Sequence, residues 1–192
     1  VDGKVDNIND SFLNIASQIN RGWDLAVRYS TEVEWGELVF DTQHTCQIED
    51  ALQLRTDSTA TDYNGRMGDP KWTGNASLQL INNDWTYYWG VQYIGEASNH
   101  DTFGGDMASY RGTPVRVVLE APTVMYHNLS VTRAFPDQKM VARFGVNNVM
   151  GKRPPRLTTL NLGQVSTEGN SAFYSQYNWV GRAFFLNVSK DF

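Results

Sequence analysis

The last residues of the chain alternate between apolar and polar side chains and end on an aromatic one. Phe184, Leu186 and Val188 fall on one side of an extended strand, and the terminal Phe192 falls on the same side. The opposite side carries mainly polar residues such as Asn187. This alternation predicts a β-strand with one face against an apolar environment and the other against water.

The same period of two recurs along the whole chain. The alternating segments, which we expect to be strands, cover residues 12–31, 37–46, 72–81, 85–97, 115–135, 140–149 and 172–192. The fourth segment is the most aromatic, with Trp85, Tyr87 and Trp89 on one face. Pro122 marks a weak point or bulge in the fifth. Several of these segments are much longer than the five to six residues of an ordinary globular strand.

The connections between these segments alternate between short and long. Short turns are expected at 32–36, 82–84 and 136–138, and long polar loops at 47–70, 98–113 and 150–171. Because successive strands of a meander are antiparallel, all short turns then lie at one end and all long loops at the other. The sequence therefore predicts an all-β fold, an antiparallel up-and-down meander of about seven long strands.

Composition removes several classes of protein. The 192 residues contain no run of about 18 apolar residues, so a spanning helix is not expected. A mean hydropathy of −0.45 still suits strands that are apolar only at alternate positions. The net charge of −5, without a basic cluster, argues against a nucleic-acid partner. The chain opens on Val1 without a leader-like segment, and we expect a processed or truncated chain.

Catalytic and metal sites are not expected. Asp41 and His44 fall on opposite faces of one strand, and no Gly-x-Ser-x-Gly segment supplies a nucleophile. His44 and Cys46 share a strand face, and His100 and Asp101 share a loop, but neither pair has a convincing third and fourth ligand. Cys46 is the single cysteine and cannot form an internal disulfide. We expect no enzyme, no metal and no cofactor.

Four segments in order carry a family resemblance. They are Arg21-Gly22-Trp23-Asp24-Leu25, Tyr88-Trp89-Gly90-Val91-Gln92-Tyr93-Ile94-Gly95, His127-Asn128-Leu129-Ser130-Val131, and Phe144-Gly145-Val146-Asn147-Asn148-Val149-Met150 followed by Pro154-Pro155. With the terminal Phe192 they resemble the C-terminal part of the TonB-dependent receptors, ligand-gated transporters of the Gram-negative outer membrane. Val149-Met150-Gly151 departs from the family's usual Leu-Phe-Asp, and Lys190 stands where an outward aromatic is common.

The resemblance implies an architecture and an activity. The family's barrel has 22 strands around an N-terminal plug, so residues 1–192 would be the C-terminal portion of the barrel domain, without the plug and the first strands. The short turns and Phe192 would lie at the periplasmic rim, and Phe184, Leu186, Val188 and Phe192 would form the signal for insertion into the outer membrane. The implied function is energy-coupled uptake of a scarce ligand such as a ferric siderophore, cobalamin or an oligosaccharide. The implied partners are outer-membrane lipid, the plug and remaining strands, the TonB complex through the N-terminal part, and a small-molecule ligand.

Candidate ligand contacts are cationic, aromatic and neighbouring polar residues of the long loops, since cations suit anionic chelates and aromatic rings suit sugars or catechols. They are Tyr63, Arg66, His100, Asp101, Tyr110, Arg111, Lys152, Arg153 and Arg156. Most polar loop residues are simply solvated whatever the role of the loop, and each of these residues also fits that more common interpretation. The charged residues expected on the barrel lumen, which would face the plug or water, are Asp24, Arg28, Asp41 and Arg143.

Two other classes compete with this reading: a complete small outer-membrane barrel acting as an enzyme or adhesin, and a soluble β-sandwich that binds carbohydrate. An odd number of strands disfavours a complete barrel. Strands of up to about twenty residues disfavour a sandwich.

Overall fold

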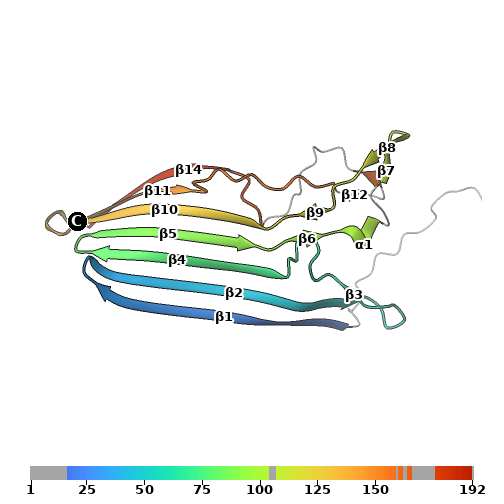
Figure 1. Ribbon diagram of the computed structural model, residues 1–192, viewed down its shortest axis with the longest axis horizontal. Coiled ribbons are helices and arrows are strands. Elements are labelled where there is room, and N and C mark those ends of the chain that lie inside the picture. The colour runs from blue at the N-terminus through green and yellow to red at the C-terminus, as the bar shows by residue number, and fades with distance from the viewer. Residues whose placement is uncertain (1–16, 104–106, 159, 162–163, 166–175, 192) are drawn as a thin grey trace, which may run out of the picture.

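The computed structural model describes residues 17–103, 107–158, 160–161, 164–165 and 176–191. Its main feature is one antiparallel sheet in which seven long strands follow one another in the order β1-β2-β4-β5-β10-β11-β14 (Figure 1). These strands are β1 Ser17–Val33, β2 Gly36–Gln53, β4 Trp72–Asn82, β5 Trp85–Ile94, β10 Val124–Phe135, β11 Met140–Asn147 and β14 Ala183–Lys190. The predicted fold class, an all-β antiparallel meander, is confirmed.

Shorter elements lie in the connections. One short strand, β3 Thr61–Asp62, pairs with β2. Three separate pairs are β6 Ala97–Ser98 with β9 Glu120–Ala121, β7 Met107–Tyr110 with β8 Thr113–Arg116, and β12 Leu160–Asn161 with β13 Gln164–Val165. The single helical turns are α1 His100–Phe103 and η1 Pro136–Gln138. Among the described residues, no helix is long and apolar enough to cross a membrane.

The short turns all lie at one end of the sheet, on the left in Figure 1, and the long connections lie at the other. β1 and β2 are joined through two residues, and Asn83 adopts a positive φ of 48° between β4 and β5. Asparagine tolerates this left-handed conformation better than most residues, which suits a tight hairpin. Between β10 and β11 the η1 turn ends at Lys139, which also has a positive φ of 50°.

β2 runs seven residues further than the alternation indicated. It ends at Gln53 rather than Cys46. The register shifts here, because Arg21 faces Glu49 while Gly22 faces Gln47, which leaves Ile48 as an extra residue. A bulge of this kind breaks the period of two without ending the strand. The expected loop 47–70 is correspondingly shorter.

Several other strands are shorter than the alternation indicated. The fifth segment, 115–135, is interrupted: β8 and β9 belong to separate small pairings, and the long strand β10 begins at Val124, two residues after Pro122. Likewise β5 ends at Ile94 rather than residue 97. β11 ends at Asn147 because Asn148 is left-handed, with a φ of 50°, and its side chain bonds to the backbone of Lys152. β14 begins only at Ala183.

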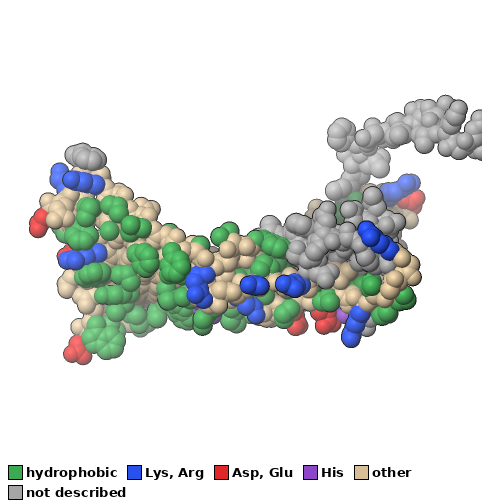
Figure 2. Space-filling model, turned by 90° about the horizontal axis from the view of Figure 1, so that it is seen from above, with side chains coloured by type: hydrophobic (Ala, Val, Ile, Leu, Met, Phe, Trp, Pro, Cys, Tyr) green, Lys and Arg blue, Asp and Glu red, His purple; other side chains and the backbone are tan. Residues whose placement is uncertain are grey.

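Cross-strand register sorts the side chains onto two faces as the sequence predicted. Rows such as Trp23–Cys46–Trp72 lie on what we call the apolar face, and rows such as Gln43–Asn75–Gln92 lie on the polar face. The apolar face is exposed: Leu25 retains 47% of its accessible surface and Leu186 retains 70%. Figure 2 shows hydrophobic side chains gathered over the half of the molecule that carries the short turns.

Aromatic residues mark both ends of the apolar face. Trp23 and Trp72 meet edge to face at the end near the long connections, with ring centroids 5.0 Å apart. Trp85 stacks on Tyr87 near the short turns, with centroids 6.2 Å apart. From Trp23 to Val33, β1 rises about 33 Å along its own axis, which at a tilt of about 45° corresponds to a height of about 23 Å, close to the apolar band of about 25 Å on outer-membrane barrels.

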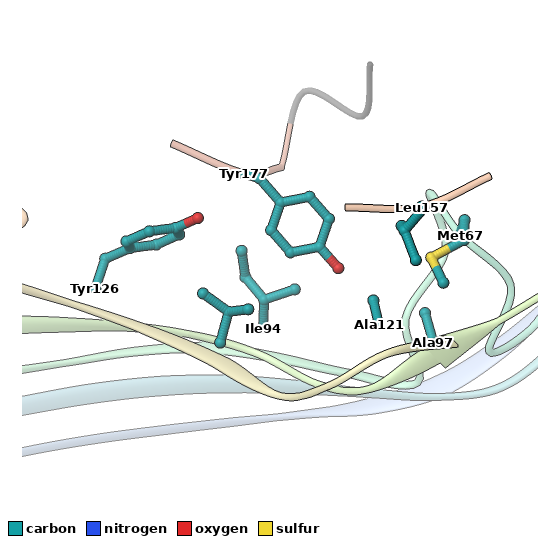
Figure 3. Close-up of a cluster of buried hydrophobic side chains, with 8 residues drawn as sticks. Met67, Ile94, Ala97, Ala121, Tyr126, Leu157 and Tyr177 are labelled. Atoms are coloured by element: carbon teal, nitrogen blue, oxygen red, sulfur yellow. The ribbon is translucent and has the colours of Figure 1, made fainter. Parts of the chain in front are cut away.

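The buried hydrophobic core lies away from this face. It consists of Met67, Ile94, Ala97, Ala121, Val124, Tyr126, Leu157 and Tyr177. In Figure 3, Tyr177 lies over Ile94 with Tyr126 to one side, while Leu157 and Met67 lie over Ala121 and Ala97. Ile94, Val124 and Tyr126 belong to the polar face at the loop end of the sheet, so the loops fold back over that face and pack on it.

Candidate functional site

The connection from β2 to β4 is organised around Asp62. Its carboxylate accepts hydrogen bonds from the backbone N–H groups of Asp50 (3.1 Å) and Asn64 (2.9 Å). These two bonds hold the pKa of Asp62 below its usual range. Burial, aided by the charge of Asp50, has the opposite effect on Asp69 and raises the pKa of that carboxyl. The loop is thus held in one conformation by polar contacts to its own backbone.

This loop presents Arg66, one of the predicted contacts, and the structure brings two others to it. An Nη2 atom of Arg66 lies 2.6 Å from the Asp101 carboxylate, and its guanidinium lies 4.7 Å from the centre of the Tyr63 ring. The Nε atom of Arg66 is buried and has no hydrogen-bond partner among the described residues. The cluster is therefore a cation fixed between a ring and a carboxylate from a different loop.

His100 and Arg111 occupy the neighbouring connection. The Nε2 atom of His100 lies 3.0 Å from the Glu120 carboxylate, so α1 is tied to β9. Arg111 lies in the tight turn between β7 and β8, with a positive φ of 50° followed by one of 80° at Gly112. Tyr110 ends β7, and its side chain lies outside the described residues.

Lys152, Arg153 and Arg156 remain exposed beyond the end of β11. Asn148 is fully buried and bonds through its side chain to both backbone groups of Lys152, which fixes where this run of cations begins. In the described part of the chain, Arg66 contacts Asp101 and Tyr63, and neither of these contacts involves the three cations. The structure therefore does not bring all the predicted residues into one site.

The polar face carries the four residues expected to face the lumen. Asp24 accepts a 2.6 Å hydrogen bond from the Thr45 hydroxyl, and Arg28 stands opposite Asp41 in the β1–β2 register. Arg143 donates from Nε and Nη2 to the Ser130 hydroxyl, at 3.1 and 3.0 Å. That guanidinium also lies between two rings, 5.7 Å from Tyr88 and 5.6 Å from Phe185.

Three amide side chains form a row across the polar face. The sequence alone did not predict this row. Gln43, Asn75 and Gln92 stand side by side on β2, β4 and β5. They line an open hollow of about 320 Å³ together with Asp41 and Ser77. Amides that both donate and accept suit hydroxyl-rich or amide-containing groups. Only the strand register reveals this row, because its members are far apart in the sequence.

The apolar face has a shallow groove of about 450 Å³ across five strands. Its lining side chains on this face are Leu38, Leu78, Leu80, Tyr87, Trp89, Leu129, Val131, Phe144 and Val146. Phe184, Leu186 and Val188 of the expected insertion signal share this face, in register with Val146, Phe144 and Ala142. Phe192 lies outside the described residues.

Among the described residues, we find no set of side chains arranged for catalysis or for binding a metal ion. Asp41 and His44 lie on opposite faces of β2, as predicted. His44 shares the apolar face with Cys46, and its ring covers Gly74, the residue opposite it on β4, so closely that a β-carbon there would overlap the ring. No set of three or more potential metal ligands converges among the residues that the structure describes.

Comparison with known proteins agrees with this geometry. The family model described as TonB dependent receptor-like, beta-barrel, matches residues 1–149. A solved structure of a mutant ferric enterobactin receptor (PfeA) from Pseudomonas aeruginosa is similar, with a TM-score of 0.57 at 16% sequence identity. The likeness covers 91% of this chain but only 22% of that receptor chain, and at this identity it concerns the fold. No curated protein matches the chain.

The family model covers well over half of the residues, with the sheet's β1 to β11 inside the matched range. TonB-dependent receptors are transporters of the Gram-negative outer membrane rather than enzymes. The protein belongs to the TonB-dependent receptor β-barrel family.

Proposed function

We propose that this chain forms part of the barrel wall and of the extracellular loops of an energy-coupled outer-membrane uptake receptor. The observation that carries the proposal is the division of one long-stranded sheet into an exposed apolar face and a polar face, within a chain that matches the family's barrel. The apolar face faces lipid, and the polar face faces the lumen.

The remainder of the receptor supplies the rest of the wall and the plug. Two features support this. The strands β1 and β14 each have a neighbour on one side only in the described sheet, and a closed barrel needs partners on both sides. The chain also corresponds to 22% of the similar receptor chain. In this arrangement residues 1–192 are the C-terminal portion of the barrel domain, and the TonB complex acts through the N-terminal part.

The orientation follows from the asymmetry of the connections. Outer-membrane barrels have short periplasmic turns and longer extracellular loops. The turn at Asn83 and the η1 turn therefore lie in the periplasm, while the Arg66 cluster faces the exterior. Phe184, Leu186, Val188 and Phe192 serve as the insertion signal at the lipid-facing side of the last strand.

A ferric siderophore is the ligand class that the loops support best. Arg66, Lys152, Arg153 and Arg156 provide cations, and Tyr63 a ring, which suit an anionic chelate with aromatic groups. The similar solved structure is that of a ferric enterobactin receptor. Cobalamin and oligosaccharides, which the amide row at Gln43 would also suit, are the alternatives.

Uptake of radioactive iron as ferric enterobactin tests this function. A strain that lacks the receptor is compared with the same strain carrying it, with and without TonB, and with cyanocobalamin and a maltooligosaccharide as further labelled ligands. We expect iron uptake that needs both the receptor and TonB. Equal uptake of all three ligands with and without the receptor would contradict the proposal.

One pair of variants tests the loop contacts. Arg66→Ala removes the cation held by Asp101, while Arg55→Ala removes an exposed cation of the same loop whose ion pair is with Asp57, at 3.1 Å. If Arg66 binds the chelate, its loss weakens binding of ferric enterobactin about tenfold or more, as expected for a charged hydrogen bond. Arg55→Ala leaves the affinity unchanged. Equal affinities for both variants would remove Arg66 from the binding site.

A further inference from the structure

A cation lies on the apolar face at its short-turn end. Arg133 is exposed there, with its guanidinium 4.9 Å from the centre of the Trp85 ring and 4.7 Å from the centre of the Phe135 ring. It takes part in no salt bridge within the described ranges of the chain. Two rings thus hold the guanidinium in place through cation–π contacts and leave its N–H groups available.

The apolar groove begins next to this cation. Val131, two residues before Arg133 on the same face of β10, lines the groove, and so does Tyr87, which stacks on Trp85. One row farther from the short turns, the groove is lined by Leu129 and its cross-strand partner Val146. A fixed cation therefore adjoins the short-turn edge of a groove of about 450 Å³ that is lined almost wholly by apolar side chains.

More positive charge lies nearby on the same end of the sheet. Lys190 of β14 faces Met140, which in turn faces Phe135, so it belongs to the apolar face one row beyond Arg133. Lys139 is exposed in the turn that follows η1. Basic residues at a membrane interface attract anionic headgroups, and their long side chains reach toward phosphates while their stems stay in apolar surroundings.

We propose that Arg133 and the adjoining groove form a binding site for one glycerophospholipid of the periplasmic leaflet. The phosphodiester accepts hydrogen bonds from the Arg133 guanidinium, which suits phosphate oxygens better than a point charge does. An acyl chain lies along Val131 and Leu129. The inference rests on the proposed function, because it needs the short turns to face the periplasm.

The position along the strand selects the lipid. Lipopolysaccharide also carries phosphates, but it occupies the outer leaflet, at the end of the sheet where Trp23 and Trp72 lie. Arg133 is on the opposite side of the apolar band. A phospholipid, whose phosphate sits at the inner interface with its chains directed toward the membrane centre, fits the order of cation and groove.

Native mass spectrometry of the complete receptor, purified in detergent and delipidated, tests the site. Phosphatidylethanolamine and a diacylglycerol with the same acyl chains are added back separately to the wild-type protein, to Arg133→Ala and to the matched control Arg143→Ala. Arg143 is also an arginine between two rings, but it lies on the polar face. Heat-modifiable gel mobility shows that each variant has folded.

We expect the wild type and Arg143→Ala to retain one phosphatidylethanolamine, and Arg133→Ala to bind it about tenfold more weakly, as expected for the loss of a hydrogen bond to a charged phosphate. Diacylglycerol binds weakly to all three. Equal binding of phosphatidylethanolamine by all three folded proteins would overturn the site. Two results with the wild type would also overturn the site. One is binding of diacylglycerol as strong as that of phosphatidylethanolamine, and the other is retention of lipopolysaccharide in place of phosphatidylethanolamine. Ferric enterobactin uptake in the same strains tests the proposed function separately, so the lipid site can fail while uptake remains.

Discussion

The ring of Phe185 on β14 lies directly over Gly145, its cross-strand partner on β11. A β-carbon at position 145 would overlap this ring and would also come within 2.8 Å of the carbonyl oxygen of Leu129. The glycine thus lets an aromatic side chain lie flat against the backbone of the neighbouring strand, where it also contacts Arg143. Such pairing of an aromatic residue with a glycine pins strand register.

We expect Gly145→Ala to destabilise the receptor by about 1–3 kcal/mol, the usual cost of overpacking a filled site. The temperature of the heat-induced gel-mobility shift measures this. Phe185→Leu in the same chain removes the ring and should recover part of the loss, since only the contact with the Leu129 carbonyl remains. Additive losses in the double variant would show that the ring is not responsible.

Neighbouring residues of β5 test the division of the faces. Val91 lies on the apolar face near the middle of the band, and Gln92 lies on the polar face. Val91→Arg should destabilise the receptor in a bilayer by about 2–4 kcal/mol, the cost of an arginine at the midplane of a lipid-facing strand. Gln92→Arg should be nearly neutral, because its side chain meets water. Denaturant unfolding in lipid vesicles compares them, and a reversed order would contradict the assignment of faces.

The sequence predicted the faces of the strands well because each depends only on a local period of two. Trp85, Tyr87 and Trp89 share a face for no reason beyond their spacing, and the same holds for Leu186 and Val188. The four-segment resemblance predicted the family, which the family model over residues 1–149 confirms.

Long-range features were beyond such reasoning. The bulge at Ile48 hides the continuation of β2, because an extra residue inverts the alternation without ending the hydrogen bonding. The contact of Arg66 with Asp101 joins two loops, and the row of Gln43, Asn75 and Gln92 joins three strands. Their partners are set by tertiary register, which leaves no local signal in the chain.

The loop around Asp62 should loosen in acid. The pKa of Asp62 in the folded protein lies below the ordinary value of about 3.9. Its stabilisation of the loop is therefore complete above about pH 3.9 and is lost as the pH falls through the lower pKa of the folded state. The pKa of Asp69 is raised, so protonation of Asp69 in acid stabilises the fold instead of destabilising it. The measurement is therefore made in an Asp69→Asn background, which removes this opposing titration.

Hydrogen exchange of peptides covering residues 54–70 measures this loosening. We expect the ratio of exchange rates, Asp62→Asn over the parent, to be well above one at pH 6 and to approach one in strong acid. Asp57→Asn, in the same loop, is the control, because the hydrogen bonds that Asp57 accepts within the described ranges come from the side chain of Arg55. A ratio for Asp62→Asn that does not change with pH would contradict the role of its two backbone hydrogen bonds.

The isolated chain should not behave as a soluble monomer. The sheet edges at β1 and β14 and an apolar face with Phe184 68% exposed favour association. We expect 192-residue protein without detergent to oligomerise or aggregate. Multi-angle light scattering reports the mass, and a stable monodisperse monomer in plain buffer would contradict the open-sheet account.

Oxygen accessibility along β4 tests most directly whether one face of this sheet meets lipid. Spin labels are placed one at a time at Ala76, Ser77, Leu78 and Gln79 in the complete receptor, in a Cys46→Ser background and a lipid bilayer. The account predicts high collision rates with oxygen, which concentrates in lipid, at positions 76 and 78, and low rates at positions 77 and 79. Equal oxygen accessibility at all four positions would contradict it.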